Sequence, residues 1–253
     1  MTSIIIVTYE SEKTIEKLLT SLQKTLTKGA YEVIIVDNNS QDKTLEKVKR
    51  FSFVEVVTHN KNTGFAFACH SGAKRAKGEY LLFLNPDIML KEDILKPVIP
   101  LFEDTTIGVV GIKIKNFDST IQPSIRRFPT LISQLLIALK VPHISKRLPY
   151  LRSYYAFDFD YTKESDVDQV MGAVFFTSRT LWDSIGGFDK RFFIWFEEID
   201  YCYQVKKLGY RVLYTPNTFV QHIGGDSFSQ VSTLKKQLWF FKSMLQYFLK
   251  NGL

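Results

Sequence analysis

Carboxylates stand at three points of the sequence where a hydrophobic stretch gives way to polar residues. At the first, Asp37 ends the apolar run 33–36, and at the second, Asp87 follows the apolar run 80–84 on the rigid dipeptide Asn85-Pro86. A carboxylate fixed at the end of a strand is suited to Mg²⁺ or Mn²⁺, hard cations that prefer oxygen ligands and bridge to phosphates. Simpler interpretations are also open: Asp37 as an Asx-turn residue and Asp87 as an acid near a helix start.

The third point is the run Glu197-Glu198-Ile199-Asp200, which follows an aromatic segment at 192–196. Three acids at a helix start can simply favour the positive end of the helix dipole. Aromatic surroundings, however, raise the pKa of a carboxylate towards the range in which it abstracts a proton. Glu197 and Asp200 share a helical face, whereas Glu198 is turned about 100° from Glu197. We therefore expect one of the two adjacent glutamates to point at a substrate and the other not.

His222 ends a predicted strand at 218–222. A lone histidine is more often structural than a metal ligand, so a ligand role for His222 needs support from the rest of the pattern.

Alternating strands and helices must position these side chains. Residues 33–36 form the unbroken apolar run that is typical of a strand buried on both faces. The pattern predicts strands at 3–8, 33–36, 53–57, 80–84 and 109–114, with helices at 15–22, 42–49, 64–77 and 92–102. Repeated βα units indicate an α/β fold with a parallel sheet covered by helices on both faces.

Ligands of such sheets bind beyond the carboxyl ends of the strands. The polar residues that follow three of the strands should therefore converge on one cleft: Thr8-Tyr9-Glu10, Asp37-Asn38-Asn39 and Asn85-Pro86-Asp87.

The second half of the chain is less regular. We expect a long excursion at 115–163 with a helix near 131–140, because this segment mixes prolines, aromatics and basic residues without a clean period. The remaining predicted elements are strands at 167–177, 212–214 and 218–222, and helices at 179–184, 197–208 and 233–250.

Composition limits the function class. A chain of 253 residues with 45% hydrophobic and 23% charged residues fits one large globular domain. No apolar stretch approaches the ~20 residues of a membrane span, and no signal peptide precedes Ile4, so we expect a cytoplasmic protein. The two cysteines, Cys69 and Cys202, lie far apart, which fits a reducing compartment.

The net charge of +7 is concentrated in two basic segments. Residues 113–152 hold eight Lys or Arg against one acid, and the residues from Thr233 onward hold four Lys and no acid. Such segments attract nucleic acid, anionic lipid or phosphate-bearing substrates, and charge alone does not choose among these. Acids at strand ends would repel a polyanion, so we expect no nucleic-acid partner.

The C-terminal helix is amphipathic. Lys235, Lys242 and Trp239 fall away from an apolar stripe made of Leu234, Leu238, Phe241, Leu245, Phe248 and Leu249. This pattern is typical of a helix that lies on an anionic membrane surface. It equally fits a helix that packs on the core or on a second subunit of a homodimer.

Taken in order, these motifs and three others resemble glycosyltransferase family 2, whose members are inverting nucleotide-sugar enzymes. The resemblance covers most of the chain: Ile4-Ile5-Ile6-Val7-Thr8-Tyr9, Val36-Asp37-Asn38-Asn39-Ser40, Asn62-Thr63-Gly64-Phe65-Ala66, residues 78–87, Met171-Gly172-Ala173, Gly187-Phe188-Asp189, Phe196-Glu197-Glu198-Ile199-Asp200 and His222. It implies a single domain of GT-A fold, with a Rossmann-like, mixed and mainly parallel sheet flanked by helices. The Asn-Pro-Asp form, with Arg126-Arg127-Phe128-Pro129-Thr130 downstream, is similar to the rhamnosyltransferase branch that builds bacterial surface polysaccharides.

The resemblance also implies roles for individual residues. The donor, a dTDP- or UDP-sugar, would bind to Thr8, Tyr9, Glu10, Asp37, Asn62 and Asn85, with Asp37 on the pyrimidine ring. Asp87 and His222 would hold the Mg²⁺ or Mn²⁺ ion on the diphosphate, and Glu198 would be the general base. Arg126, Arg127, Trp195 and Glu197 would bind the acceptor, a saccharide or lipid-linked saccharide. Asn85 stands where many members of the family carry the first acid of a D-x-D motif.

These implications divide the chain into a nucleotide-sugar half at 1–115, an acceptor and catalytic half at 116–232, and a C-terminal helix at 233–253. The location that we expect is cytoplasmic, peripheral to the inner face of the cell membrane. Two other functions stay open on the sequence: a non-catalytic, basic membrane- or nucleic-acid-binding protein, and a nucleotidyltransferase. The chain has no glycine-rich loop with Arg and Lys near its start, which disfavours the nucleotidyltransferase.

Overall fold

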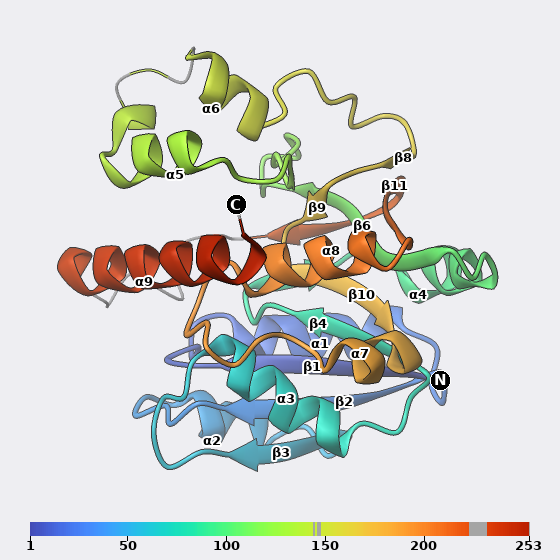
Figure 1. Ribbon diagram of the computed structural model, residues 1–253. Coiled ribbons are helices and arrows are strands. Elements are labelled where there is room, and N and C mark those ends of the chain that lie inside the picture. Colours follow the sequence, from blue (N-terminus) through green and yellow to red (C-terminus); the bar gives the residue numbers. More distant parts are fainter. Residues whose placement is uncertain (144, 146–147, 223–231, 253) are drawn as a thin grey trace.

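The computed structural model describes residues 1–143, 145, 148–222 and 232–252 of the chain. Its centre is a nine-stranded sheet in which eight strands follow the order β3-β2-β1-β4-β10-β6-β11-β5 and β8 pairs with β11 (Figure 1). The strands are β1 (Thr2–Thr8), β2 (Tyr31–Asp37), β3 (Val54–Thr58), β4 (Tyr80–Leu84), β5 (Ile88–Leu90), β6 (Ile107–Lys115), β8 (Ser165–Asp166), β10 (Val174–Ser178) and β11 (Arg211–His222).

The sheet is mixed and mainly parallel, as predicted. Strands β3, β2, β1 and β4 run parallel to one another, and β6 runs parallel to β11. Strand β10 is antiparallel to both of its neighbours, β4 and β6, and so joins the two parallel parts. The polar residues that follow β1, β2 and β4 therefore meet at one edge of the sheet.

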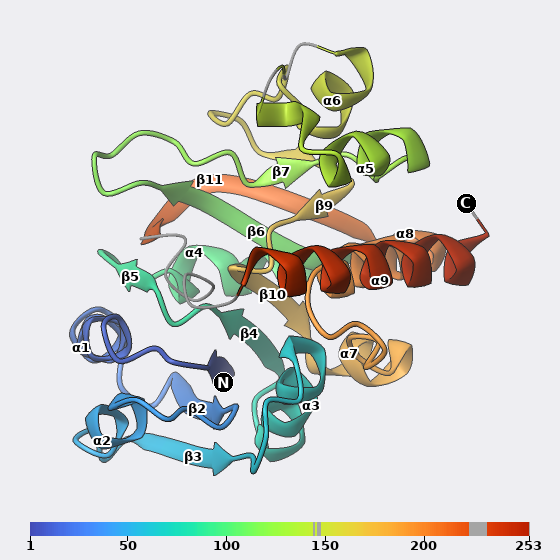
Figure 2. The same ribbon diagram turned by 90° about the vertical axis from the view of Figure 1, so that its left-hand side faces the viewer.

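Helices cover both faces of the sheet (Figure 2). On one face lie α1 (Ile15–Thr25), α2 (Thr44–Val48), α4 (Leu95–Val98) and a 3₁₀ helix at Ile99–Glu103, and on the other lie α3 (Phe65–Arg75), α7 (Arg179–Ile185) and α8 (Glu197–Lys207). In β1, Ile4 and Ile6 pack on the first face and Ile5 on the second. Burial on both faces explains why β1 and β2 are apolar without alternation.

A smaller unit lies beyond the β6 side of the sheet (Figure 1). It holds the two-stranded sheet of β7 (Ile125–Arg126) and β9 (Gln169–Val170), helices α5 (Leu131–Ala138) and α6 (Pro149–Tyr154), and a 3₁₀ turn at Val141–His143. Helix α5 begins at a capping box, in which Thr130 Oγ1 accepts from Ser133 N and Ser133 Oγ accepts from Thr130 N.

Helix α9 (Thr233–Asn251) is anchored to the domain through one face. Met244, Tyr247 and Phe248 are buried against an aromatic cluster that includes Phe192 and Phe196. The prediction that Phe248 shares one helical face with Leu245 and Leu249 was therefore wrong, because its side chain is buried whereas theirs are exposed. At the far end of the helix, the ammonium of Lys250 lies 2.6 Å from Asp200 and 2.9 Å from Asp189.

Several predicted elements differ from the structure. One continuous strand, β11, replaces the two predicted at 212–214 and 218–222, with an irregularity in its pairing to β6 between Thr215 and Phe219. The predicted strand at 167–177 is two strands, β9 and β10, in different sheets. Strand β5 was not predicted. The helix predicted at 92–102 is shorter, since Pro97 and Pro100 lack the N–H groups of a regular helix.

Cys69 and Cys202 are buried free thiols. None of the helices in the described part of the chain is long and apolar enough to cross a bilayer. Two members of the first basic segment, Lys146 and Arg147, lie outside the described residues.

Candidate active site

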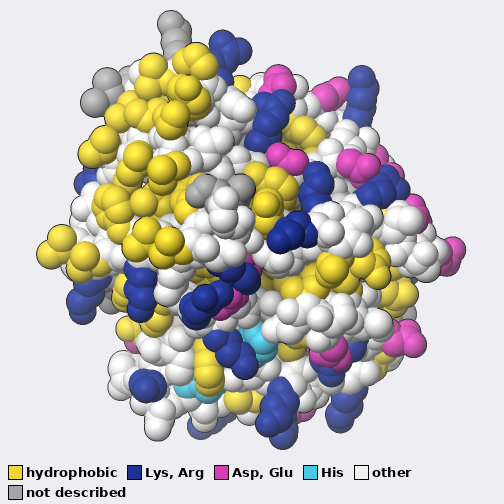
Figure 3. Space-filling model, in the orientation of Figure 1, with side chains coloured by type: hydrophobic (Ala, Val, Ile, Leu, Met, Phe, Trp, Pro, Cys, Tyr) yellow, Lys and Arg dark blue, Asp and Glu magenta, His cyan; other side chains and the backbone are white. Residues whose placement is uncertain are grey.

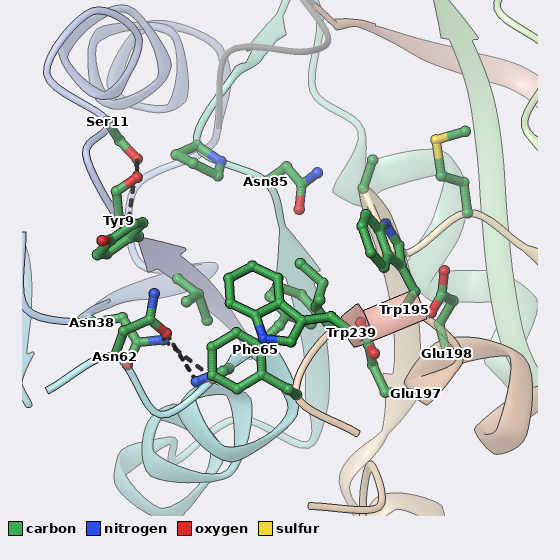
Figure 4. Close-up of a pocket in the computed structure, with 18 residues that line it drawn as sticks. Tyr9, Ser11, Asn38, Asn62, Phe65, Asn85, Trp195, Glu197, Glu198 and Trp239 are labelled. Carbon is green, nitrogen blue, oxygen red and sulfur yellow. Dashed lines mark hydrogen bonds between the residues drawn. The ribbon is translucent and has the colours of Figure 1, made fainter. Parts of the chain in front are cut away.

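A cavity of about 360 Å³ opens at the carboxyl ends of β1, β2 and β4 (Figure 4). The residues predicted for the site that line it are Tyr9, Asn62, Asn85, Trp195, Glu197 and Glu198. In Figure 4, Tyr9 and Asn62 lie on one side, the two glutamates lie on the opposite side, and Asn85 lies between them. The cavity thus joins residues from both halves of the chain.

An amide network fixes the wall on the Asn62 side. Asn38 Nδ2 donates to Asn62 Oδ1 at 3.0 Å and to the carbonyl oxygen of Gly64 at 3.2 Å. Asn38 Oδ1 in turn accepts from the backbone N–H of Thr63 at 2.9 Å. Because both ends of the Asn38 amide are used, its orientation is fixed, and Asn62 is held at the cavity surface.

Three residues predicted to bind the nucleotide do not line this cavity. Asp37 is buried and accepts from Thr8 Oγ1 at 2.9 Å, from Ser40 Oγ at 2.7 Å and from Ser40 N at 2.9 Å. Thr8 is fully buried as well. Glu10 accepts from Gln41 N at 2.8 Å. Asp37 therefore braces the loop after β2, which is the turn interpretation, while a contact with the nucleotide base stays a prediction.

The two adjacent glutamates are presented by an unusual helix start. Trp195 and Phe196, which precede α8, have φ angles of 61° and 70°, a left-handed conformation that is uncommon for aromatic residues. Both glutamates line the first cavity, so which of the two faces a substrate stays a prediction. Only Glu198 also lines a second cavity.

Burial governs the charge of this pair. Burial raises the pKa of Glu198 to about 7. Backbone hydrogen bonds, including one to Gly172, act in the opposite direction and lower this pKa. Burial and then the adjacent Glu198 raise the pKa of Glu197 well above its usual range. Within the described residues, the Oε2 atom of each glutamate is buried without a hydrogen-bond partner. Near neutral pH, Glu198 is thus suited to accept a proton from a bound hydroxyl.

A close approach at Gly64 fixes the loop before these glutamates. Gly64 has a φ of 85°, and a Cβ atom there would collide with the backbone of Phe193. The next residue, Phe65, donates its N–H to the carbonyl oxygen of Phe193 at 2.7 Å. Only glycine permits this contact, which ties the start of α3 to the loop that carries Trp195.

Asp87 and His222 lie together beside the first cavity, although neither lines it. Asp87 Oδ1 is 3.1 Å from His222 Nε2, and both side chains are buried. His222 Nδ1 is 2.9 Å from Gln122 Oε1, which orients the ring. The carboxylate oxygen and imidazole nitrogen are donor types that bind divalent metals. The described residues contain no cluster of three or more His, Cys, Asp or Glu that would complete a metal site.

The second cavity, of about 280 Å³, shares Met171, Trp195 and Glu198 with the first. Arg126 lines it, as do Ser124, Gln134 and Gln169. The Oγ atom of Ser124 is buried and lacks a hydrogen-bond partner among the described residues. This cavity therefore offers polar groups to a ligand that also reaches Glu198.

Arg127, predicted beside Arg126 in an acceptor site, lines neither cavity. Its guanidinium pairs instead with Asp158 at 2.6 Å, on the surface. Because Arg126 and Arg127 are adjacent at the end of a strand, their side chains leave in opposite directions.

Sequence reasoning missed several lining residues. Trp239 of α9 and Phe193 line the first cavity, and their rings pack with centroids 4.6 Å apart. Gln134 of α5 lines the second cavity. The one available signal was that Trp239 lies off the apolar stripe of its helix.

The mainly parallel sheet, with amide side chains at its carboxyl edge and, opposite them, two glutamates that each have a buried oxygen, fits the GT-A fold that the sequence motifs imply. Residues 3–180 match the family model described as glycosyl transferase family 2. The chain therefore belongs to glycosyl transferase family 2.

Curated relatives match over almost the whole chain. The rhamnosyltransferase WbbL of Escherichia coli is 26% identical, over 99% of this chain and 94% of its own length. The N-acetylglucosaminyl-diphospho-decaprenol L-rhamnosyltransferase of Mycobacterium tuberculosis is 24% identical, over 94% of this chain and 82% of its own length. The resemblance to the rhamnosyltransferase branch is confirmed at this level of identity.

Solved structures support the GT-A fold. The mannosyltransferase PcManGT of Pyrobaculum calidifontis, in complex with GDP-Man and Mn²⁺, matches with a TM-score of 0.67 at 17% identity, over 99% of this chain and 63% of its own. TarS 1–349 of S. aureus, in complex with UDP-GlcNAc, matches with a TM-score of 0.64 at 20% identity, over 98% of this chain and 65% of its own. The chain thus spans less than two thirds of these solved chains.

Proposed function

We propose that this glycosyltransferase transfers a sugar, rhamnose from dTDP-rhamnose or another sugar from a UDP donor, to a saccharide or lipid-linked saccharide during surface polysaccharide synthesis. The observation that carries the proposal is the position of Glu198. This glutamate lines both cavities, has an oxygen to which no residue described in the structure donates, and has a pKa raised to about 7. A group placed between two ligand sites is suited to act on the bond formed between their ligands.

In the proposed reaction, the acceptor hydroxyl lies in the second cavity and the donor sugar in the first. Glu198 takes the hydroxyl proton while the oxygen attacks the anomeric carbon from the face opposite the nucleoside diphosphate. One carbon–oxygen bond forms as the bond to the diphosphate breaks, so the anomeric configuration inverts. Ser124, Arg126, Trp195 and Glu197 would orient the acceptor.

The donor nucleotide would lie against Tyr9, Asn62 and Asn85 in the nucleotide-sugar half, residues 1–115. Asp37 and Thr8 are buried and, like Glu10, do not line the cavity, so a base contact would need the loop after β2 to shift. Residues 116–232 would then form the acceptor and catalytic half, with 233–253 as the C-terminal helix.

Asp87 and His222 would hold Mg²⁺ or Mn²⁺. Their donor atoms are close together, and Gln122 orients the imidazole, so the residues present fit such an ion with two protein ligands. When bound, a divalent cation stabilises the negative charge that develops on the leaving diphosphate. The solved neighbour PcManGT contains Mn²⁺, which supports this proposal.

A lipid-linked acceptor would place the enzyme in the cytoplasm, at the inner face of the cell membrane. The Mycobacterium tuberculosis relative is an N-acetylglucosaminyl-diphospho-decaprenol L-rhamnosyltransferase, which supports this class of acceptor.

Release of nucleoside diphosphate tests the proposal. The protein would be incubated with Mg²⁺ or Mn²⁺ and with a panel of dTDP-, UDP- and GDP-sugars, with and without a polyprenyl-diphosphate-linked N-acetylglucosamine. We expect acceptor-dependent release of dTDP or UDP, with none from the Glu198→Gln variant. Release of GDP alone would contradict the pyrimidine donor, and no release from any donor would contradict the proposed reaction.

A further inference from the structure

Helix α5 is oriented with its polar residues inward and its apolar residues outward. Ser133 and Gln134 are each only 1% exposed, whereas Leu131, Leu135 and Leu139 are 50%, 42% and 72% exposed. Ser133 is held inward by the capping box with Thr130, and Gln134 Nε2 donates to Ser133 Oγ at 3.2 Å. A surface helix of a globular protein ordinarily has the opposite arrangement.

Helix α9 exposes a second set of apolar side chains. One side of the helix is buried, as described above, and Ser243 Oγ also donates to the carbonyl oxygen of Ile194 at 2.8 Å. The other side carries five exposed residues at spacings of three and four: Leu234, Leu238, Phe241, Leu245 and Leu249. The exposed stripe is therefore additional to the face that holds the helix in place.

The two helices pack against each other and form one surface, the α5–α9 platform. We define it by the exposed residues Leu131, Ile132, Leu135, Leu139, Leu234, Leu238, Phe241, Leu245 and Leu249. Figure 3 shows hydrophobic side chains gathered over this part of the molecule, with Lys and Arg side chains beside them. An apolar surface of this extent marks a binding site for a partner or a membrane.

The charges around the platform identify its partner. Lys140, Lys235 and Lys242 are exposed, and neither α5 nor α9 contains an acid. A surface of leucines bordered by lysines matches an anionic bilayer, whose acyl chains receive the apolar groups while its headgroups pair with the ammonium groups. A second copy of the chain fits less well, since a two-fold interface would bring the same lysines together.

The platform helices also form part of the second cavity. Gln134 of α5 and Phe240 of α9 both line it, close to Glu198. Each helix therefore presents one face outward and contributes one side chain to the proposed acceptor site. A sugar carried on a lipid diphosphate would then reach Glu198 while its lipid stays in the bilayer.

We propose that the α5–α9 platform docks on an anionic membrane and presents the second cavity to a lipid-linked acceptor. This inference rests on the proposed function for the acceptor, but the docking step does not.

Vesicle co-sedimentation tests docking. The full chain would be mixed with vesicles of phosphatidylcholine alone or with 30% phosphatidylglycerol, as a probe composition. We expect binding to the anionic vesicles that weakens as salt rises. The Ile132→Gln/Leu135→Gln and Leu238→Gln/Leu245→Gln variants should each bind about tenfold or more weakly, because each loses two insertable side chains. Leu208→Gln/Phe117→Gln, which alters two exposed hydrophobics outside the platform, should bind like the wild type.

Variants that remove lysine charges measure the electrostatic contribution to vesicle binding. Lys235→Gln/Lys242→Gln should bind anionic vesicles several-fold more weakly and show a smaller salt effect, whereas Lys28→Gln/Lys49→Gln should change neither. Binding that is insensitive to all platform variants would overturn the proposal. The proposal would also be overturned if light scattering showed a dimer for the wild-type chain without lipid and a monomer for the Ile132→Gln/Leu135→Gln variant.

Sugar-transfer assays provide a readout that is independent of vesicle binding. The platform variants should keep wild-type nucleotide binding and transfer to a short, soluble acceptor, but lose transfer to the lipid-linked acceptor in vesicles. Vesicle binding without any transfer would leave docking supported and contradict the proposed function. If the Ile132→Gln/Leu135→Gln variant transferred sugar to both acceptors at wild-type rates, the platform proposal would be contradicted and the proposed function would not.

Discussion

The Oδ1 atom of Asp87 lies 3.1 Å from Nε2 of His222, although 135 positions separate the two residues. The pairing of β5 with β11 explains this contact, because the ladder places His222 opposite Ile88, the residue after Asp87. The short strand β5, which sequence periodicity did not predict, is therefore the element that assembles the proposed metal pair.

Replacing Asp87 by Asn should weaken metal dependence and activity together, because the amide removes the anionic ligand of a hard cation. We expect kcat/KM to fall on the order of 100-fold and the metal concentration for half-maximal activity to rise at least tenfold. Asp183→Asn, at an exposed carboxylate on α7, is the matched control and should leave both unchanged. An unaltered metal response of Asp87→Asn would rule out the metal role of this residue.

Glu198→Gln should abolish transfer while donor affinity stays within about twofold, because a base acts in the transition state and the amide keeps the shape. The expected loss in kcat is about 10²- to 10⁴-fold. Glu197→Gln, the adjacent control, should be milder. Steady-state kinetics and donor titrations measure both effects. If Glu197→Gln is the more damaging change, the assignment of the base is wrong.

A pyrimidine nucleoside diphosphate should stabilise the fold in the presence of a divalent cation. A free nucleotide concentration of 100 times the Kd should raise the free energy of unfolding by about 2.7 kcal/mol. For a chain of this size that corresponds to a rise in Tm of roughly 5–10 °C. Thermal-shift titrations with dTDP and UDP, with and without Mn²⁺, measure it, and ADP serves as the control. Absence of a shift with either pyrimidine nucleotide would argue strongly against the proposed donor site.

The free energy of unfolding should fall as pH rises from 5 to 8, owing to the two buried glutamates. Their pKa values are higher in the folded state, so their contribution is full below the unfolded value of 4.5 and is lost on approaching the folded value, about 7 for Glu198. For Glu198, the difference between the unfolded and folded pKa corresponds to a loss on the order of 3 kcal/mol in the free energy of unfolding.

Denaturant melts of wild type and Glu198→Gln across this pH range test this expectation. The variant should lose less stability, because it removes one of the two groups that must ionise while buried. Glu103→Gln, at an exposed position, should follow the wild type. A wild-type curve that is flat or rises with pH would show that the pair is not buried as protonated acid.

The first half of the fold could be predicted because each βα unit carries a local signal. The apolar runs of β1 and β2 and the polar residues after β4 follow from burial on both faces and from the position of the ligand edge. The smaller unit could not be predicted in this way. The short strands β7 and β9 pair across 43 positions, from Arg126 to Gln169, and such pairing leaves little periodicity in either segment.

For the candidate site, the resemblance led to Glu198 and Asn62, which line one cavity, and to Asp87, which lies beside His222; their roles stay predictions. The direction in which a side chain points could not be predicted where packing in the folded protein decides it. Arg126 and Arg127 are alike in sequence, yet only Arg126 lines a cavity. Phe248 and Leu249 both belong to an apolar stripe, yet only Phe248 is buried.

The position of β10 has a consequence for folding. This strand, at 174–178, lies between β4, at 80–84, and β6, at 107–115, and joins the two parallel parts of the sheet in the described part of the chain. During synthesis, β1 to β4 therefore leave the ribosome about 90 residues before β10, the strand that covers the edge of β4. That edge, apolar and unpaired in the nascent chain, is a site for aggregation, and late closure by β10 is a non-local step that slows folding.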